Sequence, residues 1–274
     1  PGHSSAASDV YKRQHKTPPC QGSCPSGEDI RGWLQIVRGI EQPPEDMSMS
    51  EYAFRRSTSA NPFPSQMGRV CPAPCQSGCN RNEVDDYVGI NAVEQFIGDK
   101  AIKEGYTFDP APKLQKERVA IIGGGPAGLS AAYQLRKMGY ASTIFEERKE
   151  LGGMMRYGIP GYRTPRDLLD KEIERIINLG DIEIVLGKRV GKDVKLEDVE
   201  KSHDAVLWTI GCWNGKALPV DGGDATNCIT GVDFLEAFCD GRLKVGSKKV
   251  ICVGGGDTSI DVVSVARRLG HISK

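Results

Sequence analysis

Three glycines between an apolar run and a helical pattern constrain the fold of this chain most. The segment VAIIGGGPAGLSAA, residues 119–132, has the spacing G-x-G-x-x-G at Gly123, Gly125 and Gly128. The first glycine allows a tight turn, the second lets a pyrophosphate approach the backbone, and the third lets helix and strand pack closely. The N-terminus of the helix then offers N–H groups to the phosphates. The pattern predicts a βαβ unit that binds a dinucleotide.

Residues after this turn favour FAD as the dinucleotide. Glu146 ends a predicted strand at 142–146, 18 residues after Gly128, where a carboxylate can bind the ribose hydroxyls of adenosine. Gly152 and Gly153 remove side chains where a flavin dinucleotide would lie against the chain. An ordinary loop is the alternative interpretation of these two glycines.

Strand and helix patterns alternate from Arg118 onward, which is typical of a parallel sheet covered by helices. Predicted strands cover 119–122, 142–146, 182–186 and 205–210, and predicted helices cover 128–138 and 165–179. Thr164 is the expected N-cap of the second helix, with Pro165 at its first position. Gly211 would form a second glycine turn on the flavin side.

A second nucleotide turn, VICVGGGDTSIDVV at residues 250–263, lies about 130 residues beyond the first. Gly254 and Gly256 occupy the first two glycine positions, and Ser259 is small enough to permit close packing at the third. We expect a strand at 249–253 and a helix after it. Two such turns indicate a flavin domain with an inserted nicotinamide domain. The residues that select NAD or NADP would lie on the strand after Lys274.

Residues 15–115 have a different composition. They contain five of the nine cysteines and 11 of the 16 prolines, with helical patterns at 29–40 and 91–104 and no sustained β-alternation. A stretch of this kind has a small apolar core and would need a bound metal ion or metal cluster to stabilise its fold. Residues 108–113 are typical of a linker.

The cysteines of this region are Cys20 and Cys24, followed by Cys71, Cys75 and Cys79. Zinc sites usually contain C-x-x-C pairs, and the chain has none. Proline follows two of these cysteines, as it often does in iron–sulfur proteins, whose clusters take soft thiolate ligands. The spacing favours a cluster, with zinc or structural thiols as open alternatives. The isolated cysteines are expected to be core residues: Cys212, Cys228, Cys239 and Cys252.

Composition excludes several classes of protein. Lys plus Arg and Asp plus Glu both number 36, so no net charge favours nucleic acid or an anionic membrane. No apolar run approaches the roughly 20 residues of a membrane span, and no secretory leader is visible. We therefore expect a cytoplasmic protein, in which clustered cysteines bind metal more often than they form disulfides. The four histidines are scattered and expected at the surface, and no catalytic side chain is predicted.

Both ends of the sequence are unusual. Residues 1–14 lack an initiator Met and any hydrophobic periodicity, so we expect a non-native or disordered tail. The sequence stops at Lys274, just after the helix of the second turn. We interpret it as a fragment that is inactive by itself and binds FAD poorly.

Several motifs, in order over residues 15–274, resemble those of one family. They are PPCQGSCPSGEDIRGWL, NPFPSQMGRVCPAPCQSGCNR, VGINAVEQFIGD, VAIIGGGPAGLSAA, ELGGMMRYGIPGYRTP and VICVGGGDTSIDVV. The chain resembles the small (beta) subunit of NADPH-dependent glutamate synthase and the N-terminal part of dihydropyrimidine dehydrogenase. It is also similar to iron–sulfur flavoproteins that serve other electron acceptors.

The resemblance implies an α-helical [4Fe–4S] domain followed by an α/β, Rossmann-like flavoprotein for FAD and NAD(P), truncated at its C-terminus. It also implies two ligand sets. The first cluster would be bound by Cys24, Cys71, Cys75 and Glu94. The second would use Cys20 and Cys79 with a C-x-x-C pair expected upstream, where the unusual residues 1–14 stand. One cluster site is thus complete and the other half-built.

These features predict an oxidoreductase subunit that passes electrons from NAD(P)H through FAD to one or two clusters, and on to a large catalytic subunit or another acceptor. The alternatives are a non-catalytic iron–sulfur module or a related flavoprotein of pyrimidine or sulfur metabolism. The predicted division is a tail at 1–14, a cluster domain at 15–115, a FAD domain at 116–217 and the start of the nicotinamide domain at 218–274. The candidate cofactor-binding residues are Gly123, Gly125, Pro126, Ala127, Gly128, Glu146, Gly152, Gly153, Arg156, Gly211, Gly254, Gly256, Asp257, Thr258 and Ser259.

Overall fold

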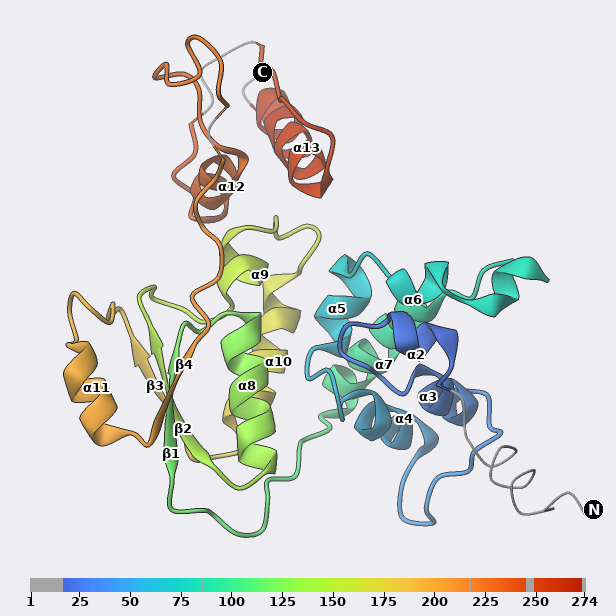
Figure 1. Cartoon of the computed structure of the whole chain (residues 1–274). Helices are drawn as coiled ribbons and strands as arrows, with labels where there is room; N and C mark the ends of the chain where they lie inside the picture. Colours follow the sequence, from blue (N-terminus) through green and yellow to red (C-terminus); the bar gives the residue numbers. More distant parts are fainter. Residues whose placement is uncertain (1–16, 85, 217, 245–248, 273–274) are drawn as a thin grey trace, which may run out of the picture. The chain divides into compact units, whose positions relative to one another are not determined.

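The computed structural model describes residues 17–84, 86–216, 218–244 and 249–272 (Figure 1). The chain divides into two units, the first ending at Glu104 and the second beginning at Gly105. The tail predicted at 1–14 lies outside the described residues.

Helices are the regular elements of the first unit's described residues, as the sequence predicts. They are α2 (Pro19–Ser23), α3 (Ile30–Val37), α4 (Met49–Ser57), α5 (Pro64–Val70), α6 (Pro74–Ser77), the 3₁₀ turn η1 (Asn80–Glu83) and α7 (Ile90–Glu104). Asp29 caps α3, because its Oδ1 accepts a hydrogen bond from the backbone N of Gly32 at 3.0 Å. The apolar side chains of Trp33, Phe54 and Ile97 are buried in this unit.

Helices α5 and α7 cross at two glycines. A Cβ on Gly68 would lie 2.4 Å from the backbone N of Gln95, and one on Gly98 would lie 2.1 Å from the backbone N of Ser65. Any side chain at either position would therefore force the two helices apart. This close crossing fixes the middle of α7 against α5.

The second unit is built on a parallel sheet of four strands, in the order β3-β2-β1-β4. The strands are β1 (Arg118–Ile122), β2 (Ala141–Glu146), β3 (Ile182–Leu186) and β4 (Ala205–Trp208). The helices are α8 (Pro126–Lys137), α9 (Gly153–Tyr157), α10 (Arg166–Ile177), α11 (Leu196–Ser202), α12 (Gly231–Cys239) and α13 (Asp257–Ile272). Figure 1 shows α8 and α11 on opposite faces of the sheet. This arrangement confirms the predicted α/β fold.

Two predicted elements differ in the structure. Residues 249–253 form no strand, because no described segment pairs with them and a β-ladder needs a neighbour. Helix α10 begins at Arg166, so Pro165 and not Thr164 is its N-cap. The Thr164 hydroxyl instead donates to the backbone O of Met155 in α9, at 3.1 Å.

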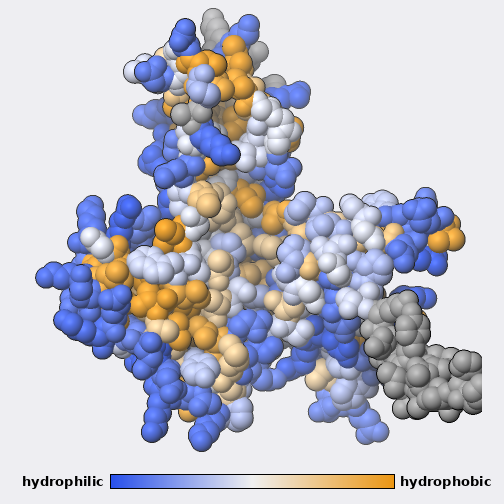
Figure 2. Space-filling model, viewed as in Figure 1, coloured by the Kyte–Doolittle hydropathy of each residue, from blue (hydrophilic) through white to orange (hydrophobic). Residues whose placement is uncertain are grey.

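Apolar side chains gather over the sheet of the second unit in Figure 2. Leu207, Trp208 and Ile210, at the end of β4 and just after it, are all exposed. The opposite edge of the same strand is paired with β1 through Val206 and Leu207. The outer side of β4 is thus an unpaired, apolar sheet edge among the described residues.

Candidate functional site

The first glycine turn follows β1 and has the close packing that its spacing predicts. Gly123 has φ of 110°, a left-handed conformation that favours glycine. A Cβ on Gly128 would lie 2.0 Å from the carbonyl O of Gly123 and 2.9 Å from Oγ1 of Thr209. Gly125 differs, because a Cβ there would meet only the Cα of Gly153, at 3.6 Å. The space above Gly125 is therefore available to a ligand that approaches the first turn of α8.

The structure brings Gly152 and Gly153 to this turn. The backbone N of Gly152 donates to the carbonyl O of Gly124 at 2.9 Å. A Cβ on Gly153 would lie 2.6 Å from the Cα of Gly125, and both glycines have positive φ. The missing side chain of Gly153 allows two backbone segments to touch, while the role of Gly152 and Gly153 in binding a flavin stays a prediction.

Glu146 closes the same site from the end of β2. Its carboxylate is buried, with Oε2 accepting from the backbone N of Gly124 at 2.7 Å and Oε1 accepting from the backbone N of Arg148 at 2.9 Å. The predicted acidic residue thus lies directly at the glycine turn. Pro126 and Ala127 open α8 at this position, and the helix has no side-chain N-cap.

Two further predicted cofactor residues lie near this turn. Gly211 has φ of 70° and faces Trp213. Arg156 donates to the carbonyl O of Leu151 and pairs with Asp170. Its guanidinium is therefore already bonded within the protein, and its role as a cofactor ligand stays a prediction.

The second nucleotide turn precedes α13. Gly254 has φ of 128°, and a Cβ there would lie 2.8 Å from Oγ of Ser259. Ser259 thus fills the position of the third glycine and closes the turn. Gly256, Asp257 and Thr258 form the exposed start of the helix.

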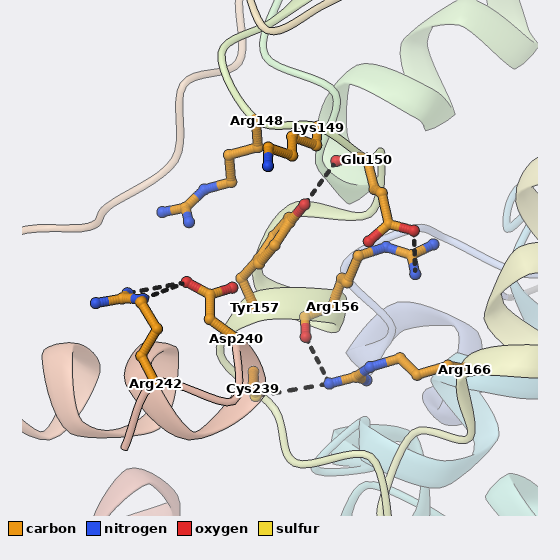
Figure 3. Close-up of a pocket in the computed structure, with 9 residues that line it drawn as sticks. All are labelled: Arg148, Lys149, Glu150, Arg156, Tyr157, Arg166, Cys239, Asp240 and Arg242. Carbon is orange, nitrogen blue, oxygen red and sulfur yellow. Dashed lines mark hydrogen bonds and ion pairs between the residues drawn. The ribbon is translucent and has the colours of Figure 1, made fainter. Parts of the chain in front are cut away.

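A cavity of about 590 Å³ in the second unit is rich in arginine (Figure 3). Its lining residues are Arg148, Lys149, Glu150, Arg156, Tyr157, Arg166, Cys239, Asp240 and Arg242. Arg148 lies over the rings of Tyr157 and Trp213, 4.6 and 4.2 Å from their centroids, and pairs with Glu236 at 2.6 Å. No motif in the sequence singles out this arginine.

The Arg166 side chain, which lines that cavity, donates mainly to backbone oxygens. Its guanidinium donates to the carbonyl oxygens of Met155 at 2.8 Å and Ile159 at 2.7 Å, and to Sγ of Cys239 at 3.6 Å. Burial lowers the pKa of Arg166. The contacts join α9, the loop after it and the end of α12.

The structure corrects the prediction that the four isolated cysteines are core residues. Cys212 and Cys228 are exposed and are not core residues, while Cys239 and Cys252 are half-buried. Burial raises the pKa of Cys239, so its thiol is protonated at neutral pH. His203 is also half-buried rather than at the surface, with Nε2 3.0 Å from Oγ1 of Thr143.

The five cysteines of the first unit fall into two electrostatic groups. Cys71 and Cys75 interact with each other and with Cys24 and Glu94, whereas Cys20 interacts with Cys79. Each of the five is a free thiol. This grouping has the same membership as the two ligand sets that the family resemblance implies.

Burial dominates the protonation of three of the five thiols. It raises the pKa of Cys20 and Cys71, and raises that of Cys75 to about 11. Neutral thiols are therefore favoured until a cation binds and stabilises the thiolates. A group with several positive charges, such as an iron–sulfur cluster, fits this donor set.

Glu94 lies in α7 and is buried beside these thiols. Its Oε1 accepts a hydrogen bond from Nδ2 of Asn61 at 2.7 Å. Glu28, also buried, hydrogen-bonds to both residues, and burial raises its pKa. Neither Glu28 nor Asn61 was found by sequence reasoning, since no spacing pattern marks them.

Two kinds of feature are absent from the described residues. No group of three or more His, Cys, Asp or Glu side chains there is arranged to hold a metal ion. No helix in the described part of the chain is long and apolar enough to cross a membrane. Assignment of the individual thiols to a cluster stays a prediction.

Two family models match the two units. One, described as pyridine nucleotide-disulphide oxidoreductase, matches residues 117–272. The chain belongs to this family. The other, described as dihydropyrimidine dehydrogenase domain II, 4Fe-4S cluster, matches residues 11–106. These matches confirm the predicted fold class and the predicted FAD, NAD(P) and 4Fe–4S cofactors.

Several curated proteins are similar to most of the chain. The NADPH-Fe(3+) oxidoreductase subunit beta of Geobacter sulfurreducens is 39% identical over 264 residues, covering 93% of this chain and 37% of that protein. The glutamate synthase [NADPH] small chain of Mycobacterium tuberculosis is 33% identical over 270 residues, covering 93% of this chain and 54% of that protein. The chain thus spans about a third to a half of these relatives. These names confirm the family resemblance found in the sequence.

Among solved structures, Mycobacterium tuberculosis FprA in complex with NADPH is similar to part of the chain. It has 23% sequence identity and a TM-score of 0.42, over 45% of this chain and 29% of that one. The roles assigned to individual residues in both units remain predictions.

Proposed function

We propose that this chain is part of an electron-transfer subunit of the glutamate synthase small-subunit type. In such a subunit, the glycine turns would hold FAD and NAD(P)H and the thiols would hold a [4Fe–4S] cluster, and these bound groups would supply hydride and single-electron transfer toward a partner. The observation that carries the proposal is the presence, in one chain, of a tightly packed dinucleotide turn and a set of three thiols, one buried and two half-buried, beside a buried carboxylate. The two family matches support the same pairing.

The residues proposed to hold FAD are those of the first glycine turn. The open space at Gly125 and the start of α8 suit a pyrophosphate, because backbone N–H groups and the positive end of the helix dipole face it. Glu146 would bind adenosine ribose hydroxyls from its position at Gly124. Gly254–Ser259, at the second turn, would bind the nicotinamide nucleotide in the same way.

The proposed ligands of the complete cluster are Cys24, Cys71, Cys75 and Glu94. Cys20 and Cys79 would belong to a second cluster. A reducing, cytoplasmic compartment suits these free thiols.

The acceptor is a separate question, and one comparison favours a second candidate. The relative with 39% identity is named for Fe(3+) reduction, whereas that with 33% identity is a glutamate synthase small chain. An acceptor other than the large subunit of glutamate synthase is therefore a specific alternative. A non-catalytic electron-transfer module is the remaining one.

Anaerobic reduction of the natural gene product tests the proposal. The flavin absorbance should bleach on addition of NADPH or NADH, and an artificial dye should then be reduced. A flavin that neither nucleotide bleaches, in a protein that reduces no dye, would contradict the proposed activity and favour the non-catalytic module. Addition of candidate large subunits or ferric complexes then distinguishes the acceptors.

A further inference from the structure

Asn61 is a buried amide in the loop between α4 and α5. It is only 7% exposed, and both ends of its side chain are engaged. Its Oδ1 accepts from the backbone N of Phe63 at 3.0 Å, and its Nδ2 donates to Oε1 of Glu94 at 2.7 Å. Because the oxygen is held by a backbone N–H, the donor end of the amide must face Glu94.

Glu94 is held from more than one side. Glu28, in the loop before α3, hydrogen-bonds to Glu94 and to Asn61. These buried side chains come from segments that are far apart in the sequence. Burying these polar side chains costs desolvation free energy, and apolar side chains could fill the same space without that cost.

The same carboxylate interacts electrostatically with two thiols, those of Cys71 and Cys75. A carboxylate that ligates a metal group needs outer hydrogen bonds to fix its orientation, and loss of such a partner weakens metal binding. Asn61 has the position and the donor for that task.

We propose that Asn61 is a positioning residue that orients the Glu94 carboxylate for ligation of the cluster bound by the neighbouring cysteines. The inference rests on the proposed cluster ligands. On this proposal, the neutral amide of Asn61, which is not itself a ligand, sets the orientation of the fourth ligand, Glu94. The amide makes no contact with the cluster and acts through Glu94.

Asn61→Asp is the sharpest variant. It keeps the shape of the side chain and the acceptor for the N–H of Phe63, but replaces the donor facing Glu94 with a carboxylate oxygen. We expect iron loss to a chelator to accelerate about tenfold or more, and the EPR spectrum of the reduced cluster to change. Asn61→Ser, which retains a small donor, should lie between this variant and the wild type. Asn178→Asp, an exposed amide of the second unit, is the matched control.

Glu94→Ala separates the possible outcomes. If Asn61→Asp and Glu94→Ala alter the EPR spectrum and the chelation rate in the same direction, the inference is supported. If only Glu94→Ala does so, Asn61 does not position the ligand, although the cluster assignment stands. If neither does, Glu94 is not a ligand and the inference is wrong. Loss of iron in Cys75→Ser would then still support the assignment of a cluster to the cysteines. Wild-type protein without labile sulfide would overturn the cluster and this inference together.

Discussion

Arg163 and Asp261 form an ion pair at 2.7 Å, and the Asp261 side chain is only 8% exposed. The pair joins the loop between α9 and α10 to helix α13 of the second nucleotide turn. Arg268 of the same helix lies 3.9 Å from the ring centroid of Tyr162 in that loop. The segment that follows Gly152 and Gly153 is therefore tied to the second nucleotide turn by charge and by ring contact.

Arg163→Gln should loosen this connection. The substitution leaves a buried carboxylate without its cation, which costs about 1–3 kcal/mol of the free energy of unfolding. Hydrogen exchange measured by mass spectrometry should become faster in α13, with little change in β1 and β2.

Arg242→Gln provides the comparison. Arg242 is largely exposed and pairs with Asp240, so its loss should change the free energy of unfolding by less than about 1 kcal/mol. Exchange in α13 that is equal in the wild type and Arg163→Gln would show that the ion pair does not hold the helix.

Gly125 and Gly128 should respond differently to alanine. A Cβ on Gly128 would collide with the backbone of Gly123, so Gly128→Ala should lower the melting temperature and the FAD content together. Gly125 has extended backbone and an ordinary contact at 3.6 Å, so Gly125→Ala should fold normally. It should nevertheless bind FAD at least tenfold more weakly, because the methyl group occupies space for the pyrophosphate.

Flavin fluorescence titration and thermal unfolding measure the two effects separately. Gly161→Ala, where a Cβ meets nothing within 4 Å, is the control. Equal FAD affinity in Gly125→Ala and Gly161→Ala would place the pyrophosphate elsewhere.

Asp99 should make stability depend on pH. Burial alone would raise its pKa, but hydrogen bonds from Arg69 and Ser65 outweigh this and hold the pKa below its usual range. The folded chain therefore binds fewer protons at this carboxyl than the unfolded chain does. Its contribution to stability is complete above the unfolded pKa and is lost as the pH falls through the lower, folded pKa.

Asp99→Asn should accordingly lower the free energy of unfolding at pH 7. The difference from the wild type should shrink as the pH falls below about 4. Urea unfolding at several pH values measures this, with the exposed Asp86→Asn as control. A difference that stays constant down to about pH 2 would assign the effect to lost packing.

The parts of the fold that could be predicted from sequence are those with a local cause. The strand at 182–186 has the bounds predicted from its apolar pattern, and the turn at Gly123–Gly128 follows from steric rules for glycine. The prediction of a strand at 249–253 was wrong, because the apolar pattern is local whereas strand formation requires a neighbouring strand. The exposure of Cys212 depends in the same way on what packs around it.

The candidate sites show the same division. Cysteine spacing and the position of Glu146 indicated cofactor binding. Closely spaced cysteines, and an acidic residue at the end of the strand that follows a glycine turn, seldom serve another purpose. Arg166 and Asn61 could not be found, since an arginine or asparagine gains its role only when the fold brings acceptors from other segments to it. Long-range hydrogen-bond partners leave no periodic signal in a sequence.

The most direct test is the metal content of the anaerobically purified protein. The account predicts iron and acid-labile sulfide in equal amounts, about four of each for every complete cluster. Both should be lost in Cys75→Ser and kept in Cys228→Ser, whose thiol is exposed in the other unit. Stoichiometric zinc without labile sulfide, or full iron content in Cys75→Ser, would contradict the account.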